Sequence, residues 1–285
     1  MPDIPKLSRR SLALRIGAAA MASSSLNLLI GCGGGSGGST KSVGTGSTHP
    51  NATDYLNFFL NLEYLEAQFF LIGSTGSGLS SALTGGASAG QVIGGSLVPF
   101  KTPVYANLAK QIGAQEQLHV GDLRDQLFSG AVAMPNIDFT KGFTDVGSQC
   151  GLGTSFNPFA DEISFLLGAM FIESIVASAY NGVLGNGLAL VNSFVGIETA
   201  HAGVYRTLIS ATGGNTLTNA NNITLYSNQY GGGSDQPITA SILTAGSTSG
   251  QSLGRSPANT LHMLYQSPVG APGSFFPKGF NGFIR

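Results

Sequence analysis

Residues 54–72 form an apolar run of helical periodicity that contains two glutamates, Glu63 and Glu66. Apolar side chains stand on nearly every face of this run, which is typical of a helix buried in a protein core. A carboxylate in such surroundings is costly unless it is paired or binds a metal ion. Only 9% of the residues in the chain are charged, so the presence of two glutamates in this apolar helix requires a specific explanation. The run therefore predicts a buried helix, N-capped by Asp54, with a polar function inside it.

Three further segments have the length and apolar pattern of long helices: residues 103–128, 158–182 and 188–212. Pro103 and Pro158 begin the first two of these segments, and glycines at or just beyond the three ends set the other limits. The tight connection VLGNG (183–187) joins the last two helices, and the long loop 129–157 separates the two pairs. Four helices in two pairs with a long crossover are the pattern of a four-helix bundle. The sequence predicts an all-α fold with long loops.

The predicted bundle occupies only part of the chain. We expect an export signal at 1–32, a Gly/Ser/Thr-rich flexible linker at 33–50 and the bundle at 51–214. Residues 215–285 are rich in Gly, Asn, Thr and Ser and predict an irregular C-terminal extension that packs on the bundle, with one short helix at 256–266. No second domain is expected.

The N-terminus has the features of an export signal. Ser8-Arg9-Arg10-Ser11-Leu12 resembles a twin-arginine signal, which exports folded proteins. Leu29-Ile30-Gly31-Cys32 resembles a lipoprotein cleavage box, which would make Cys32 the lipidated first residue; the alternative is a plain secretory signal that contains a cysteine. Arg15 argues against a membrane-spanning helix here. We expect an exported protein, periplasmic or outer-membrane-anchored in a Gram-negative-type bacterium, that touches the membrane only through its N-terminal lipid.

Charge and cysteine content exclude other classes. The formal net charge is −1 with no basic patch, so no nucleic-acid partner is expected. Besides Cys32 the chain has only Cys150, so the mature protein is expected to lack an intrachain disulfide. Cys150 is interpreted as a lone thiol in a loop.

Two Glu-x-x-His motifs stand in the second helix of each predicted pair, as Glu116 with His119 and Glu198 with His201. This spacing puts the two side chains next to each other on one helix face. A bundle that binds two metal ions needs two such motifs plus one glutamate from each remaining helix. The alternative interpretation is that both motifs are surface residues, with the histidines capping local polar networks.

An internal comparison selects the remaining glutamates. Glu63 and Glu173 are each followed by an alanine four residues later and an aromatic residue seven residues later. Glu66 corresponds to Val176, which cannot bind metal. We therefore interpret Glu66 as a residue behind the ligands or as a salt-bridge partner at the bundle edge.

The resulting candidate ligands are four carboxylates and two imidazoles. Fully ionised, the carboxylates carry a charge of −4, which two divalent cations would balance, and iron or manganese suits this oxygen-rich set better than zinc. Three helical tyrosines (Tyr64, Tyr180 and Tyr205) are expected to be core residues; the alternative is a redox or hydrogen-bonding role near the metals. The candidate ligand set is Glu63, Glu116, His119, Glu173, Glu198 and His201.

Five segments resemble the ferritin-like domain family that includes plant desiccation-related proteins and similar secreted fungal and bacterial proteins: LNLEYLEAQFFLIGSTGSGL, GAQEQLHVGDLR, VGIETAHAGVYRTLI, GRSPANTLHMLYQ and GSFFPKGFNGFI. Together they span most of residues 54–285. The resemblance implies a ferritin-like four-helix bundle. It says little about activity, because most members have no assigned reaction.

Two functions remain open from the sequence. The first is a di-metal oxidoreductase in which Glu63 and Glu173 are terminal ligands, Glu116 and Glu198 bridge the metals, and each histidine binds one. Its reaction partner would be O2 or peroxide, in iron oxidation, peroxide removal or organic oxidation. The second is a non-enzymatic stress-protective or cell-envelope protein with a structural or relict metal site. The oligomeric state is left open.

Overall fold

The computed structural model describes residues 49–184, 188–233, 235–243, 246 and 251–285. The predicted export signal with Cys32, nearly all of the linker, and residues 185–187 of the VLGNG connection lie outside the described residues. The export, lipidation and linker assignments stay predictions.

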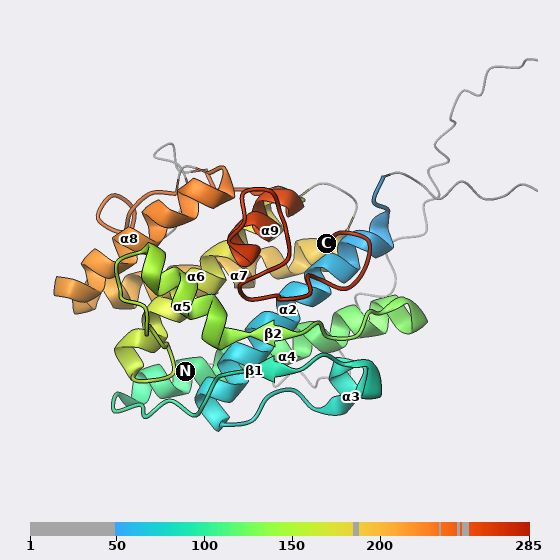
Figure 1. The fold of residues 1–285 in the computed structure, drawn as a ribbon, viewed down its shortest axis with the longest axis horizontal. Coiled ribbons are helices and arrows are strands. Elements are labelled where there is room, and N and C mark those ends of the chain that lie inside the picture. Colours follow the sequence, from blue (N-terminus) through green and yellow to red (C-terminus); the bar gives the residue numbers. More distant parts are fainter. Residues whose placement is uncertain (1–48, 185–187, 234, 244–245, 247–250) are drawn as a thin grey trace, which may run out of the picture. The chain divides into compact units, whose positions relative to one another are not determined.

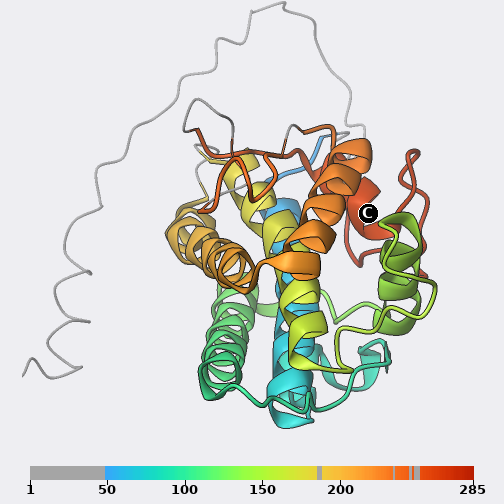
Figure 2. The same ribbon diagram turned by 90° about the vertical axis from the view of Figure 1, so that its left-hand side faces the viewer.

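The first helix pair consists of α2 (Ala52–Thr75) and α4 (Pro103–Leu127). The predicted N-cap of α2 was wrong: Asn51 is the N-cap, and Asp54 is the third helical residue, so that the two side chains form a capping box. Asn57, near the start of α2, donates a hydrogen bond of 3.0 Å to the carbonyl of Gly130 just beyond the end of α4. The two helices therefore lie side by side and run in opposite directions (Figure 2).

The second pair consists of α6 (Glu162–Gly182) and α7 (Ala189–Thr212). The helix α6 begins later than the predicted Pro158, because the side chain of Asp161 caps it by accepting from the amides of Ile163 and Ser164. Among the described residues, α6 is the one helix long and apolar enough to cross a membrane, yet 83% of its most apolar window is buried inside the protein. It has the features of a core helix.

The two central helices of the fold are α2 and α6. Both are buried on nearly all sides, whereas α4 and α7 bury only one stripe. In Figure 2, α4 and α7 lie on one side of this central pair, and α5 and α9 lie on the other. The predicted all-α, ferritin-like four-helix bundle is confirmed (Figure 1).

The segments that connect the bundle helices are more ordered than the predicted long loops, and the first of them joins α2 to α4. The first contains the short helices α3 (Ser81–Thr84) and η1 (Gly86–Ser88) and the strand β1 (Val92–Ile93). The crossover contains η2 (Phe128–Gly130), the strand β2 (Ile137–Asp138) and the helix α5 (Phe139–Gln149). The strands pair in parallel, with Val92 opposite Ile137.

Within the crossover, the prediction of a loop at 129–157 was wrong for α5. Asp138 caps this helix, and its apolar residues pack inward. Cys150, predicted to lie in a loop, directly follows α5 as a buried free thiol whose pKa burial raises to about 12.

The C-terminal extension carries two helices, α8 (Gly214–Gly231) and α9 (Pro257–Tyr265). The short helix predicted at 256–266 is confirmed as α9, whereas α8 was missed. Asn281 and Asn61 of α2 exchange hydrogen bonds of 2.9 and 3.1 Å. The extension therefore packs directly on a central helix of the bundle.

Candidate metal centre

The two Glu-x-x-His motifs point into the bundle from the outer helices. Glu116 and His119 lie one turn apart on the buried stripe of α4, and Glu198 and His201 do the same on α7. Both glutamates are completely buried, and the histidines are 8% and 4% exposed. The alternative interpretation of surface motifs was therefore wrong.

The central helices contribute three more carboxylates. Glu63 and Glu66 of α2 and Glu173 of α6 are all completely buried. The interpretation of Glu66 as a salt-bridge partner at the bundle edge was wrong, because Glu66 lies inside the bundle and its charged neighbours are the other four glutamates. Its spacing from Glu63, three residues along an otherwise apolar helix, was the sequence signal for this position.

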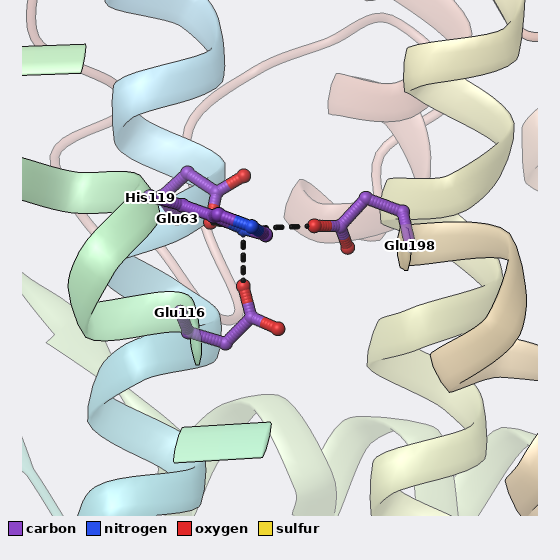
Figure 3. Close-up of side chains that lie close together, drawn as sticks. All are labelled: Glu63, Glu116, His119 and Glu198. Atoms are coloured by element: carbon purple, nitrogen blue, oxygen red, sulfur yellow. Dashed lines mark hydrogen bonds and ion pairs between the residues drawn. The ribbon is translucent and has the colours of Figure 1, made fainter. Parts of the chain in front are cut away.

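The imidazole of His119 lies among three carboxylates. Its Nδ1 is 3.3 Å from Glu63 Oε2, 3.1 Å from Glu116 Oε2 and 3.0 Å from Glu198 Oε1. Figure 3 shows these four side chains converging from both helix pairs. Because Nδ1 carries at most one hydrogen, it can satisfy only one of the three carboxylates at a time. We call these residues the His119 group.

The imidazole of His201 faces the other side of Glu116. Its Nδ1 is 2.9 Å from Glu116 Oε1 and 3.8 Å from Glu173 Oε2. Its Nε2 is 2.8 Å from the side-chain oxygen of Gln115. A proton on Nε2 donates to Gln115 and leaves the Nδ1 lone pair free for a metal ion, as is usual for histidine ligands. We call His201, Glu116 and Glu173 the His201 group.

A third group of converging side chains contains only carboxylates. Glu66, Glu173 and Glu198 each place an oxygen within 4.8 Å of the others; we call them the Glu66 group. The three groups share members pairwise: Glu116 belongs to both histidine groups, Glu173 joins the His201 and Glu66 groups, and Glu198 joins the His119 and Glu66 groups. Seven side chains from all four bundle helices thus form one connected cluster.

Most of the oxygens in this cluster have no hydrogen bond. Of the ten carboxylate oxygens, Glu63 Oε1 accepts from the Tyr180 hydroxyl, and Glu116 Oε2 bonds to His119. The other eight are buried without a hydrogen bond to any described residue. Buried unpaired carboxylate oxygens are rare and costly, and a bound cation relieves that cost. The donor set therefore fits a metal ion.

Comparison with known proteins agrees with this architecture. The model of the ferritin-like domain matches residues 51–211, which is more than half of the chain. The chain belongs to the ferritin-like domain family. It is also similar to the ferritin-like catalase Nec2 of Nesocodon mauritianus, with 23% identity over 261 residues that cover 81% of this chain and 84% of the relative. No solved structure matches the chain.

In this ferritin-like domain the carboxylates hold protons more tightly than usual. Burial and the charge of Glu63 raise the pKa of Glu116 to about 8, and burial with Glu116 and Glu63 does the same for Glu198. Burial and the neighbouring carboxylates raise the pKa of Glu173 well above its usual range. A bound cation would replace these protons, because metal ligands must be deprotonated.

The two histidines differ in charge. Burial alone would lower the pKa of His119, but Glu63, Glu116 and Glu198 outweigh it and raise that pKa well above its usual range. Burial lowers the pKa of His201, which therefore stays neutral. In the metal-free ferritin-like domain, His119 is the one cation inside the cluster, against five carboxyl groups.

Tyr180 of α6 makes a hydrogen bond within the cluster, as in the alternative that the sequence left open for the helical tyrosines. Its hydroxyl donates a hydrogen bond to Glu63 Oε1 across the two central helices, and its ring packs on Phe59 with the centroids 4.3 Å apart. The prediction of a plain core residue is therefore incomplete for Tyr180. The prediction of a core residue fits Tyr205, whose buried hydroxyl has no hydrogen bond to the described residues.

Proposed function

We propose that this ferritin-like protein binds two iron or manganese ions and uses them to break down hydrogen peroxide. The observation that carries the proposal is the buried cluster, in which eight carboxylate oxygens have no hydrogen bond to a described residue. The choice of peroxide among possible oxidants is supported by the similarity to a protein named a ferritin-like catalase.

Each histidine group would hold one ion. The His119 group offers one nitrogen and three carboxylates, and the His201 group offers one nitrogen and two carboxylates. Glu116 turns one oxygen toward each imidazole, Oε2 toward His119 and Oε1 toward His201, so it would help to hold both ions. Mixed carboxylate and imidazole ligands suit iron and manganese.

When bound, two such ions would supply the redox capacity needed to convert two molecules of H2O2 into two of water and one of O2. The residues of the chain have other tasks. Tyr180 holds Glu63 in place, and Gln115 orients His201. The apolar side chains of α2 and α6 exclude bulk water from the carboxylates, which strengthens every electrostatic interaction in the site.

Solvent reaches the cluster from the side of the histidines. The side chains of His119 and His201 are 10% and 6% exposed, whereas the glutamates in contact with them are completely buried. The ring of Phe194 stacks on His119 with the centroids 4.1 Å apart and covers part of this side. Access this narrow selects a small substrate, which favours peroxide or O2 over a bulky organic molecule.

The test is to load the purified protein with Mn²⁺ or Fe²⁺ and desalt it. Bound metal is then measured per chain, together with O2 release from H2O2 at an oxygen electrode. We expect about two ions per chain, as a di-metal bundle requires, and O2 release that depends on them. The double variant Glu116→Ala/Glu198→Ala should lose both. Glu162→Gln, a surface glutamate at the start of α6, is the control and should lose neither.

Two outcomes would contradict the proposal. Less than about one ion per chain would remove the metal centre itself. Two bound ions without peroxide consumption would instead favour the structural-site alternative, in which the metal only stabilises the bundle.

A further inference from the structure

Glu66 is the buried carboxylate that a two-metal site does not need. It is completely buried in α2, and neither of its oxygens has a hydrogen bond to a described residue. Among the described residues no Lys, Arg or His forms an ion pair with it, and its charged neighbours are Glu63, Glu116, Glu173 and Glu198. A carboxylate in this position needs a cation or a hydrogen-bond donor as its partner, and its charged neighbours are all carboxyl groups.

Both neighbours that converge with Glu66 are predicted metal ligands. One oxygen each of Glu66, Glu173 and Glu198 lies within 4.8 Å of the others. An ion at the centre of such a triangle is within reach of all three oxygens after small side-chain movements. On the α2 helix, Glu63 and Glu66 lie one turn apart on the same face. The helix therefore serves two parts of the cluster, since Glu63 joins the His119 group and Glu66 joins Glu173 and Glu198.

The other central helix, α6, has no carboxylate equivalent to Glu66. Val176 occupies the corresponding place on α6 and is completely buried. The cluster is thus asymmetric, with two carboxylates from α2 and one from α6. Full ionisation gives five negative charges, one more than two divalent ions neutralise. A fifth carboxylate without a metal contact would leave that charge unpaired in the core, which is a large cost.

We propose that Glu66 is a direct ligand of the two-ion centre and, with Glu173 and Glu198, binds one of its two ions, a hard cation such as Mn²⁺ or Fe²⁺. The inference rests on the proposed function, because it assumes that the cluster binds metal. It extends the predicted set of six ligands to seven. Carboxylate oxygens are typical ligands of hard divalent cations.

The experiment compares the wild-type protein with Glu66→Gln, Glu66→Asp and the surface control Glu162→Gln, each loaded with Mn²⁺. Bound manganese per chain, competition with a chelator and the Mn²⁺ EPR spectrum are measured. Glutamine keeps the shape of the side chain and removes the charge. Aspartate keeps the charge and withdraws the carboxylate by one methylene group.

A direct ligand requires both charge and reach. We expect Glu66→Gln and Glu66→Asp to lose one ion per chain or to bind manganese at least tenfold more weakly, with an altered EPR spectrum. Glu162→Gln should match the wild type. The metal-free Glu66→Gln variant should melt no lower than the metal-free wild type, because glutamine fills the same space and is neutral without binding a proton, so a loss of metal will not reflect unfolding.

Three results would overturn the inference. Unchanged stoichiometry, affinity and EPR spectrum in Glu66→Gln would remove Glu66 from the centre and leave the proposed function intact. Full binding by Glu66→Asp with loss in Glu66→Gln would show that only the charge matters. A wild-type protein that binds no manganese or iron would overturn the inference and the proposed function together.

Discussion

At the scale of single residues, the site is built from carboxylates with too few hydrogen-bond donors. His119 Nδ1 faces three of them, and Tyr180 supplies the one hydroxyl that bonds a cluster oxygen among the described residues. Groups that hold a metal ligand in place contribute to affinity without touching the metal. We therefore expect the single hydroxyl of Tyr180 to contribute strongly to metal affinity.

Replacing Tyr180 with phenylalanine tests this role. The ring remains, but Glu63 loses its hydrogen bond, so we expect metal affinity to fall about 10- to 100-fold with the fold preserved. Chelator competition measures the affinity. Tyr205→Phe is the matched control, because the Tyr205 hydroxyl is buried without a hydrogen bond and its loss should change affinity little. Equal effects of the two substitutions would contradict the positioning role.

The raised pKa values predict how the metal-free protein responds to pH. Glu116 and Glu198 have a pKa of about 8 in the folded protein against 4.5 ordinarily. Between these values the folded state binds more protons than the unfolded state. Their contribution to stability is therefore fully present below about pH 4.5 and is lost as pH rises through about 8.

His119 acts in the same sense, because its raised pKa keeps it protonated above 6.5 only when the protein is folded. The lowered pKa of His201 has the opposite effect on stability. It acts only below about pH 6.5, where this histidine binds a proton more readily in the unfolded chain than in the folded protein. We expect the metal-free protein to melt several degrees higher at pH 5.5 than at pH 7.5 in thermal denaturation. Metal-loaded protein should show the reverse, since protons compete with metal. A flat profile for metal-free protein would contradict the shared protonation.

Six of the seven cluster residues follow from the sequence, and the seventh shows the limit of that reasoning. The paired motifs and the match of Glu63 with Glu173 rest on spacing along helices, which the chain carries locally. Glu66 was set aside because its counterpart is Val176. That comparison assumed two equivalent halves, and only the packing of α2 against its neighbours shows that they differ.

At the scale of elements, close approach of α2 and α4 brings Glu63 within reach of His119. Gly113 of α4 makes this approach possible. A Cβ atom built there would lie 3.2 Å from the backbone nitrogen of Leu71 and 3.2 Å from the Cβ of Phe70 in α2. Gly121, two turns further along α4, faces open space.

This pair of glycines allows a matched test. Gly113→Ala should push α2 and α4 apart and destabilise the protein by about 1–3 kcal/mol, with weaker metal binding because Glu116 follows one turn later. Gly121→Ala should stabilise the helix by about 0.5–1 kcal/mol. Denaturant unfolding measures both. Stabilisation by both substitutions would show that the helices need no close contact at Gly113.

Helices with strong apolar patterns could be predicted, and weakly patterned ones could not. The segments α2, α4, α6 and α7 were expected because apolar residues recur along them at helical spacing. The helix α8 is rich in Asn and Thr, which are poor helix formers, and it forms because Ile223 and Tyr226 pack on the bundle. The helix α5 was missed because it is short and contains two glycines.

Over the whole of the described chain, the C-terminal extension and the four-helix bundle pack around one hydrophobic core. Arg255 is 2% exposed and forms an ion pair with the buried Asp235. It also donates to Ser178 Oγ of α6 at 2.8 Å and to the carbonyl of Gly231 at 3.2 Å. One side chain thus joins α6, α8 and the segment before α9.

Arg255→Met should therefore destabilise the protein by about 3–5 kcal/mol, because it leaves Asp235 buried without its partner. Lys141→Met is the control. Lys141 pairs with Asp145 on the surface, with side chains 57% and 29% exposed, and exposed pairs contribute about 0.2–1 kcal/mol. The free energy of unfolding from denaturant titration measures both. A small effect of Arg255→Met would show that the extension is not needed for the stability of the bundle.

The central claim is that the seven buried side chains form a metal centre. The most direct test is a crystal structure of the manganese-loaded protein with anomalous scattering data. We expect anomalous peaks inside the cluster, with Glu116 between two of them and oxygens of Glu66 within about 2.0–2.6 Å of a peak. Loaded crystals without a peak in the cluster, or with peaks only on the surface, would contradict it.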